Sequence, residues 1–232
     1  MRGLLRRGFA IACLMAMAGT GVAAVDPGAA QPPRLEFEPL PAGSYELQRI
    51  QAVPDARLLD PDGRLVRLAA TTRGKITLLT FFYTYCIDPL GCPYAYNTLR
   101  SLRERLLRDP VLAAGVRFLS VSFDPSHDTP EALRNYGADF IADPRFEWRF
   151  LTARNVPELM PLLNDLGQDV SVDVDERGRP TRALHHMLKM FLLDPEGEVR
   201  EIYTLAYLQP TVIFNDIRTL WLERAGARGN NP

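Results

Sequence analysis

The stretch that most constrains the fold is Leu78–Thr98, which reads LLTFFYTYCIDPLGCPYAYNT. Its first six residues are apolar or aromatic apart from one threonine, which is typical of a buried strand. A polar loop flanked by Cys86 and Cys92 follows, and Pro93 stands where a helix can begin. A strand that carries two cysteines to the N-terminus of a helix indicates thiol chemistry or the binding of a soft metal.

Strand and helix patterns alternate along the rest of the chain. Two short apolar segments around Asp60-Pro-Asp-Gly63 predict a β-hairpin over residues 57–68, and VRFLSVSF predicts a buried strand over 116–123. Further strands are predicted over 146–151, 187–193 and 199–203, helices after 93, from 128, over 156–166 and over 210–224, and a loop or small hairpin over 167–183. This order indicates an α/β domain with a mixed sheet covered by helices on both faces. The cysteine loop leaves the carboxyl end of a central strand, where such sheets usually place their ligands.

The N-terminal segment has the pattern of an export signal. Three arginines precede an uncharged run over residues 8–25, which ends in small residues. We predict a signal peptide over 1–24; the alternative is an uncleaved membrane anchor, because about 18 apolar residues reach the lower limit for spanning. Cleavage would remove Cys13 and leave Cys86 and Cys92 as the two cysteines of a protein in an oxidising compartment, the periplasm.

The composition of the remaining chain predicts its division into segments, and the net charge excludes one class of function. Residues 25–52 are rich in proline and are predicted to form a linker or arm, residues 53–224 one domain, and residues 225–232 a flexible tail. The formal net charge of −1 gives no basic surface for nucleic acid. Contact with a membrane is expected only through the N-terminal anchor.

The two cysteines allow more than one interpretation. A thiolate near a helix N-terminus is stabilised by unpaired N–H groups and the helix dipole, and Cys92, directly before Pro93, is expected to gain more than Cys86. The plain alternative is a structural disulfide. Against it, the loop between the two cysteines is too short to restrain much of the chain.

Three histidines could add a nitrogen ligand. His127 lies in a predicted turn, whereas His185 and His186 are neighbours at the entry to a predicted strand and should face opposite sides. Two thiolates and one imidazole suit Cu(I), while zinc would require a fourth ligand. Met187 and Met190 are also soft, but their strand spacing predicts core positions.

Two aspartates near the predicted site have structural explanations. Asp124 precedes Pro125 in a turn, and Asp128 is predicted to cap the next helix. We therefore expect neither carboxylate to act directly in catalysis.

Several short motifs, in this order, resemble the Sco/SenC family of thioredoxin-like copper chaperones, and the likeness runs from about residue 53 to 222. They are Thr84-Tyr-Cys86, Cys92-Pro93, Ser122-Phe-Asp-Pro125 with Asp128-Thr-Pro-Glu131, Trp148-Arg-Phe-Leu151, and His186 ahead of Asp194-Pro-Glu-Gly197. The resemblance implies a thioredoxin-like fold, in which Cys86, Cys92 and His186 match the copper ligands of the family.

The same resemblance implies a function. Cys86 and Cys92 would cycle between dithiol and disulfide with a thiol reductant as partner, and Asp124 would lie close to the site. The cargo would be Cu(I) or Cu(II). The client would be cytochrome c oxidase subunit II, whose binuclear copper centre receives copper or has its cysteines kept reduced, or another exported copper protein.

This sequence departs from the family pattern at two places. Five residues separate the cysteines where the family has three, and His185 and Met187 flank His186 where the family has Asp and Ser or Thr. The wider loop should still let both sulfurs converge. A thiol–disulfide oxidoreductase that needs no histidine is the alternative function; a peroxidase is weaker, since no threonine–cysteine peroxidatic motif is present.

Overall fold

The computed structural model describes residues 34–229, and its centre is a six-stranded mixed sheet with the strand order β1-β10-β9-β4-β5-β6. The parallel half consists of β4 (Ile76–Phe82), β5 (Val116–Ser122) and β6 (Glu147–Leu151). The antiparallel half consists of β9 (Lys189–Leu193), β10 (Glu198–Thr204) and the two-residue β1 (Gln51–Ala52). This is the mixed sheet that the alternating pattern predicts.

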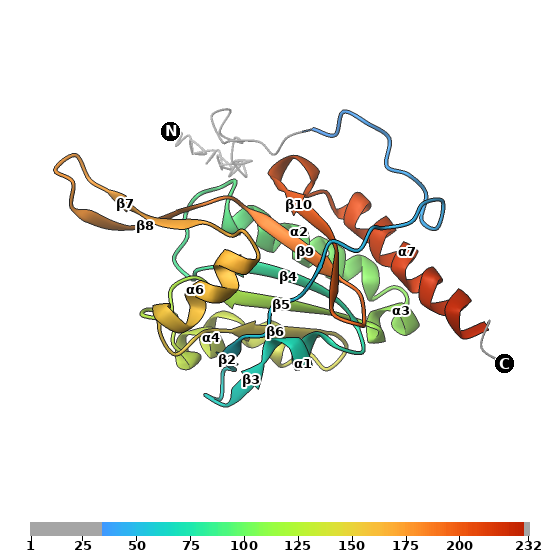
Figure 1. The fold of residues 1–232 in the computed structure, drawn as a ribbon, viewed down its shortest axis with the longest axis horizontal. Coiled ribbons are helices and arrows are strands. Elements are labelled where there is room, and N and C mark those ends of the chain that lie inside the picture. The colour runs from blue at the N-terminus through green and yellow to red at the C-terminus, as the bar shows by residue number, and fades with distance from the viewer. Residues whose placement is uncertain (1–33, 230–232) are drawn as a thin grey trace, which may run out of the picture.

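Helices flank the sheet (Figure 1). They are α1 (Leu68–Thr72), α2 (Cys92–Leu106), α3 (Pro110–Ala114), α4 (Pro130–Tyr136), α5 (Ala138–Ile141), α6 (Val156–Asp165), α7 (Pro210–Gly229) and the short 3-10 helix η1 (Leu205–Tyr207). Every residue of β4 and β5 is buried, as expected for central strands covered on both faces. Helix α2 turns Leu99, Leu102 and Leu106 into the core at the predicted helical spacing and packs against α7.

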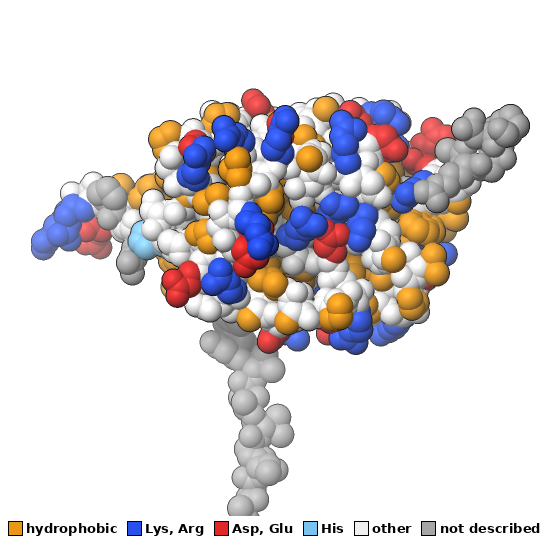
Figure 2. Space-filling model, turned by 90° about the horizontal axis from the view of Figure 1, so that it is seen from below, with side chains coloured by type: hydrophobic (Ala, Val, Ile, Leu, Met, Phe, Trp, Pro, Cys, Tyr) orange, Lys and Arg blue, Asp and Glu red, His pale blue; other side chains and the backbone are white. Residues whose placement is uncertain are grey.

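Two hairpins lie outside the main sheet. The predicted N-terminal hairpin is present as β2 (Arg57–Leu59) and β3 (Leu65–Arg67), with Gly63 at a positive φ of 76° in its turn. The second hairpin, β7 (Val170–Val174) and β8 (Pro180–His186), projects from the body of the domain (Figure 1). Charged side chains gather at its outer end (Figure 2).

The described part of the arm lies against the domain. The Tyr45 hydroxyl donates to Asp216 of α7, and the Arg200 guanidinium donates to the carbonyl of Leu47. The predicted leader over 1–24 and the start of the arm lie outside the described residues. Within residues 34–229, no helix is long and apolar enough to cross a membrane.

Candidate thiol and metal site

The two cysteines lie at the junction that the sequence predicts. Strand β4 ends at Phe82, a loop carries Cys86, and Cys92 is the first residue of α2, with Pro93 in its first turn. Both are free thiols; Cys86 is partly exposed and Cys92 is buried. The loop between them is open to solvent, and Ile87 is 91% exposed.

Several donors surround the sulfur of Cys86. They are the Cys92 thiol, the Tyr83 hydroxyl and the backbone N–H groups of Cys92 and Asp88. Burial of Cys86 alone would raise the pKa of its thiol. Together these hydrogen bonds lower the pKa of the Cys86 thiol to about 5. Cys86 is therefore a thiolate at neutral pH and is the nucleophile of the pair.

The sequence predicts that the helix stabilises a thiolate at Cys92 more than at Cys86, and this prediction is wrong. The thiol of Cys92 donates to Cys86, is buried and faces the Cys86 thiolate, and all three factors raise its pKa. Cys92 is the first residue of the helix, yet its backbone N–H donates to the sulfur of Cys86. The helix terminus thus stabilises a charge on Cys86.

His186 is the last residue of β8 and therefore belongs to the projecting hairpin, whereas the sequence places it at the entry to β9. Its ring packs against Phe123, with 4.6 Å between centroids, and against Tyr83 at 6.0 Å. Since Tyr83 follows β4 and Phe123 follows β5, the imidazole lies at the same end of the sheet as the cysteine loop.

The two ring nitrogens of His186 have different surroundings. Nδ1 lies 3.1 Å from the carbonyl oxygen of Leu184, so a proton on Nδ1 is donated there. Nε2 is buried and has no hydrogen-bond partner. A buried imidazole nitrogen with a free lone pair and a partner that fixes the other nitrogen fits a metal ligand.

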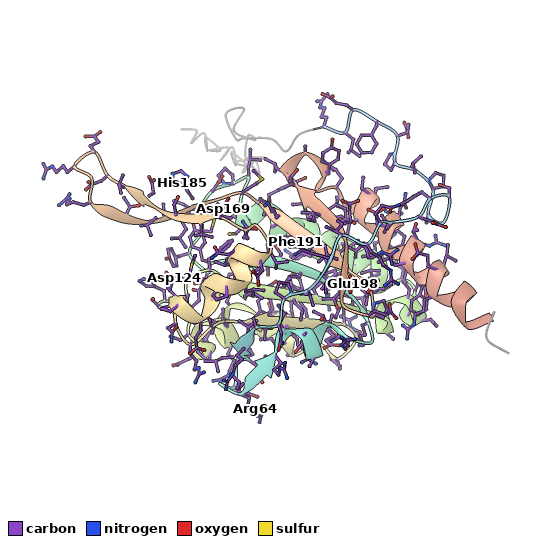
Figure 3. The ribbon with its side chains drawn as sticks, in the orientation of Figure 1. Arg64, Asp124, Asp169, His185, Phe191 and Glu198 are labelled. Carbon is purple, nitrogen blue, oxygen red and sulfur yellow. The ribbon has the colours of Figure 1, made fainter. Side chains whose placement is uncertain are left out.

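The ligating atoms do not converge in this structure. Within residues 34–229, no three side chains of His, Cys, Asp or Glu lie close enough together to hold one metal ion. His185 does not replace His186, because its side chain is 72% exposed and its Nε2 lies 3.3 Å from Asp173 (Figure 3). The neighbouring histidines thus face different surroundings, as strand geometry predicts.

Asp124 lies at the same end of the molecule (Figure 3). Its Oδ2 accepts hydrogen bonds from the Tyr85 hydroxyl and from Nδ1 of His127, each at 2.5 Å. Burial alone would raise the pKa of Asp124, but these two donors outweigh it and lower the pKa below its ordinary value. The carboxylate therefore fixes Tyr85, the residue before Cys86.

Asp128 is not the helix cap that the sequence predicts. The side chain of Thr129 accepts from the N–H of Ala132 and caps α4. Asp128 is fully buried and accepts from the backbone N–H and hydroxyl of Thr84 and from the hydroxyl of Ser122. It therefore ties the start of the cysteine loop to the end of β5.

Sequence reasoning missed the aromatic residues of the site. Tyr83 and Phe123 read as the ends of apolar strands, and nothing in their spacing distinguishes a ring that holds an imidazole from a ring in the core. Met187 was predicted to be buried with Met190, but it is 60% exposed, because β8 ends one residue before it.

The fold and the site define a thioredoxin-like domain with a two-cysteine loop at the N-terminus of a helix. The family model of SCO1/SenC matches residues 46–222, and the chain belongs to this family. An SCO1 protein homolog of Bacillus subtilis is 24% identical over 143 residues, which cover 61% of this chain and 68% of that protein.

Solved structures agree in fold. ScoI of Arabidopsis thaliana, solved with copper bound, is 20% identical and has a TM-score of 0.61 over 74% of this chain and 99% of that one. BsSco, described with a disulfide switch and as a member of the Sco family of cytochrome c oxidase assembly proteins, is 22% identical. Its TM-score is 0.57 over 76% of this chain and 98% of that one.

Proposed function

We propose that this protein is an exported copper-binding thiol protein that serves the assembly of a respiratory copper site. Cys86, Cys92 and His186 bind Cu(I) as cargo, and the client is cytochrome c oxidase subunit II or another exported copper protein. The observation that carries the proposal is the pairing of a stabilised Cys86 thiolate with the buried, partnerless Nε2 of His186 at one end of the sheet. Soft thiolates with one imidazole select Cu(I).

The relatives support the same reading. ScoI structures of Arabidopsis thaliana and of Bradyrhizobium japonicum were solved with copper bound, and BsSco is described as a cytochrome c oxidase assembly protein. A SCO1/SenC family lipoprotein of Bacillus anthracis supports export with a membrane tether. Residues 1–24 would supply the leader, or residues 8–25 the anchor.

Titration of the reduced protein with Cu(I), in competition with a chromogenic chelator, tests the ligand set. We expect one Cu(I) per chain, and His186→Ala should weaken binding by at least about 10- to 100-fold, because the loss of a second-shell partner alone typically costs that much and His186 is proposed as a direct ligand. His185→Ala is the matched control and should change the affinity less than twofold. An unchanged affinity in His186→Ala would remove the histidine from the site.

The asymmetry of the two thiols favours a second function, thiol–disulfide exchange. The Cys86 thiolate would attack a partner disulfide, form a mixed disulfide and release one partner sulfur as a thiolate, which takes the proton of Cys92. The Cys92 thiolate would then attack the sulfur of Cys86 and release the second partner sulfur as a thiolate, which takes a proton from water. The pair ends as a disulfide and the partner as a dithiol. Reductase activity toward a disulfide substrate that survives His186→Ala would favour this function over copper delivery.

A further inference from the structure

Strand β6 forms one edge of the main sheet, because it is the last strand in the order and pairs with β5 alone. Within residues 34–229, its outer side is joined to another segment only at Thr152, which exchanges two backbone hydrogen bonds with Leu59 of β2. At the other end, Pro144 has no N–H to offer a neighbouring strand. The edge that another strand can use therefore runs over residues 145–151, and Trp148 is its midpoint.

This edge is open to solvent. All five residues of β6 line a surface cavity of about 600 Å³, which lies beside the turn of the β2–β3 hairpin. Figure 2 views the molecule from the side on which β6 ends the sheet in Figure 1, and acidic and basic side chains lie next to one another there. The unpaired N–H and C=O groups of an exposed edge strand form a template for another strand. An extended chain can therefore add to the sheet at β6.

The two faces of β6 differ in character. Trp148 is buried and packs against Phe140 of α5, with 4.3 Å between ring centroids. Glu147 and Arg149 lie on the opposite face, because neighbours in a strand alternate, and Nε of Arg149 donates to Oε1 of Glu147 at 2.6 Å. The Arg149 side chain is 47% exposed, and Glu147 is its one acceptor within residues 34–229. Its remaining N–H groups are available to the carboxylate of another chain.

The charges on this edge discriminate between the registers in which two copies of the chain could pair. In an antiparallel pair related by a twofold axis perpendicular to the sheet, opposed side chains share a face, so one residue must oppose its own copy. A pair centred on Glu147 opposes two glutamates and sets Arg145 against Arg149, and a pair centred on Arg149 opposes two arginines. A pair centred on Trp148 sets Glu147 against Arg149 twice, and this register also uses the whole free edge.

We propose that β6 is a homodimer interface, on which a second copy of this chain adds in antiparallel orientation with the twofold axis at Trp148. The main sheets of the two copies then continue into one another. Two glutamates and two arginines meet near the axis in alternating sign, and on the other face Phe146 lies opposite Phe150 of the second copy. Opposite charges and aromatic pairs of this kind stabilise strand pairing. The interface forms without copper and is independent of the proposed function.

Sedimentation velocity of the full chain, in a mild detergent and at rising protein concentration, tests the dimer. The wild type should shift from the mass of one chain to that of two. Arg149→Glu replaces both Glu–Arg pairs by opposed glutamates, so the dissociation constant of the dimer should rise at least about tenfold. A wild type that stays monomeric at every concentration, or a dimer that Arg149→Glu leaves intact, would overturn the proposal.

Arg154→Glu is the matched control. The Arg154 side chain is 48% exposed and forms an ion pair with Glu158, as Arg149 does with Glu147, but it lies beyond the free edge. The dissociation constant should therefore change less than about twofold. A loss of the dimer as large as in Arg149→Glu would show that the effect comes from net charge, and would overturn the pairing at β6.

Exchanging the two charges tests the register. Glu147→Arg alone should also weaken the dimer at least about tenfold, because it sets arginines against one another. An equimolar mixture of Arg149→Glu and Glu147→Arg restores two pairs of opposite charge in the heterodimer, whose affinity should return to within about threefold of the wild type. Two folded variants that do not associate with each other would overturn the register and, with it, the interface.

Glu147→Arg also loses the ion pair with Lys75, so hydrogen exchange decides the matter if this variant does not fold. In the wild type, the outward N–H groups of residues 145–151 should exchange at least about tenfold more slowly where the dimer prevails than where the monomer prevails. The amides of β5, which is buried throughout, are the internal reference. Unchanged exchange in β6 while the protein dimerises would place the contact elsewhere and overturn the proposal.

Discussion

The hydroxyl of Thr84 donates a hydrogen bond to the buried carboxylate of Asp128, with 2.6 Å between Oγ1 and Oδ1. Thr84 begins the cysteine loop, whereas Asp128 follows β5, so the bond joins two segments 44 residues apart. The second carboxylate oxygen accepts from the N–H of Thr84 and from the hydroxyl of Ser122. The direction in which the chain leaves β4, and hence the placement of Cys86, depends on this carboxylate.

Asp128→Ala should therefore destabilise the domain by about 2–4 kcal/mol, because each buried donor left without a partner costs about 1–3 kcal/mol. Urea unfolding with unchanged slope measures the loss. Asp139→Ala, at an exposed position of α5, is the control and should stay within about 0.5 kcal/mol. A loss below about 1 kcal/mol in Asp128→Ala would mean that the network relaxes around other acceptors.

Alkylation with iodoacetamide should separate the two cysteines. Because the pKa of Cys86 is lowered to about 5, its reactivity should fall by half only when the pH drops to about 5, and should be constant from pH 7 to 8. Cys92, with its pKa raised, should react only after unfolding. Mass spectrometry of the modified peptides reports both rates. Preferential labelling of Cys92 in the folded protein would reverse the assignment of the nucleophile.

The order of helices and strands around the site could be predicted because each of them has a local sequence pattern. An uninterrupted apolar run fixes β4, the proline after Cys92 fixes the start of α2, and three leucines at helical spacing fix the face of that helix. These signals need no knowledge of distant residues, and the structure confirms the mixed α/β sheet that they predict.

The details that decide the chemistry depend on contacts between distant segments. Cys92 begins the helix, but burial and its own donation to Cys86 reverse the expected order of the thiols. Asp128 stands at a position where the sequence predicts a helix cap. Its side chain instead accepts a hydrogen bond from Thr84 in the loop after β4. His186 is placed by the hairpin of β7 and β8, whose sequence is mostly polar. Without an apolar periodicity, the sequence does not show where these strands begin and end.

The boundary of the folded domain gives a further prediction. Shortening the chain to begin at Gly43 keeps Tyr45 on Asp216, Leu47 in the core and β1 paired with β10. Shortening it to begin at Val53 removes all three contacts. The second truncation should cost more than about 3 kcal/mol, since a buried leucine contributes about 1.5–3 kcal/mol and unpaired polar groups add to the loss. Thermal unfolding compares the two, and equal midpoints would show that the arm is dispensable.

Gln168 holds the chain directly after His186, the last residue of β8. Its side chain is buried, and its Nε2 donates to the carbonyl of Met187, the residue after His186, at 2.8 Å. Gln168→Ala should lower stability by about 1–2 kcal/mol through the unpaired carbonyl. It should also weaken Cu(I) binding about tenfold by loosening the hairpin, since second-sphere changes typically cost 10–100-fold in metal affinity.

The rate of Cys86 alkylation should stay at its wild-type value in Gln168→Ala, because Gln168 is not among the groups that lower the pKa of Cys86. Gln168→Glu is the sharper variant: it keeps the shape but places an acceptor against the Met187 carbonyl, so it should weaken binding at least as much. Asp169→Asn, at the exposed neighbouring position, should bind copper as the wild type does. Full affinity in Gln168→Glu would show that β8 needs no support from this side to place His186.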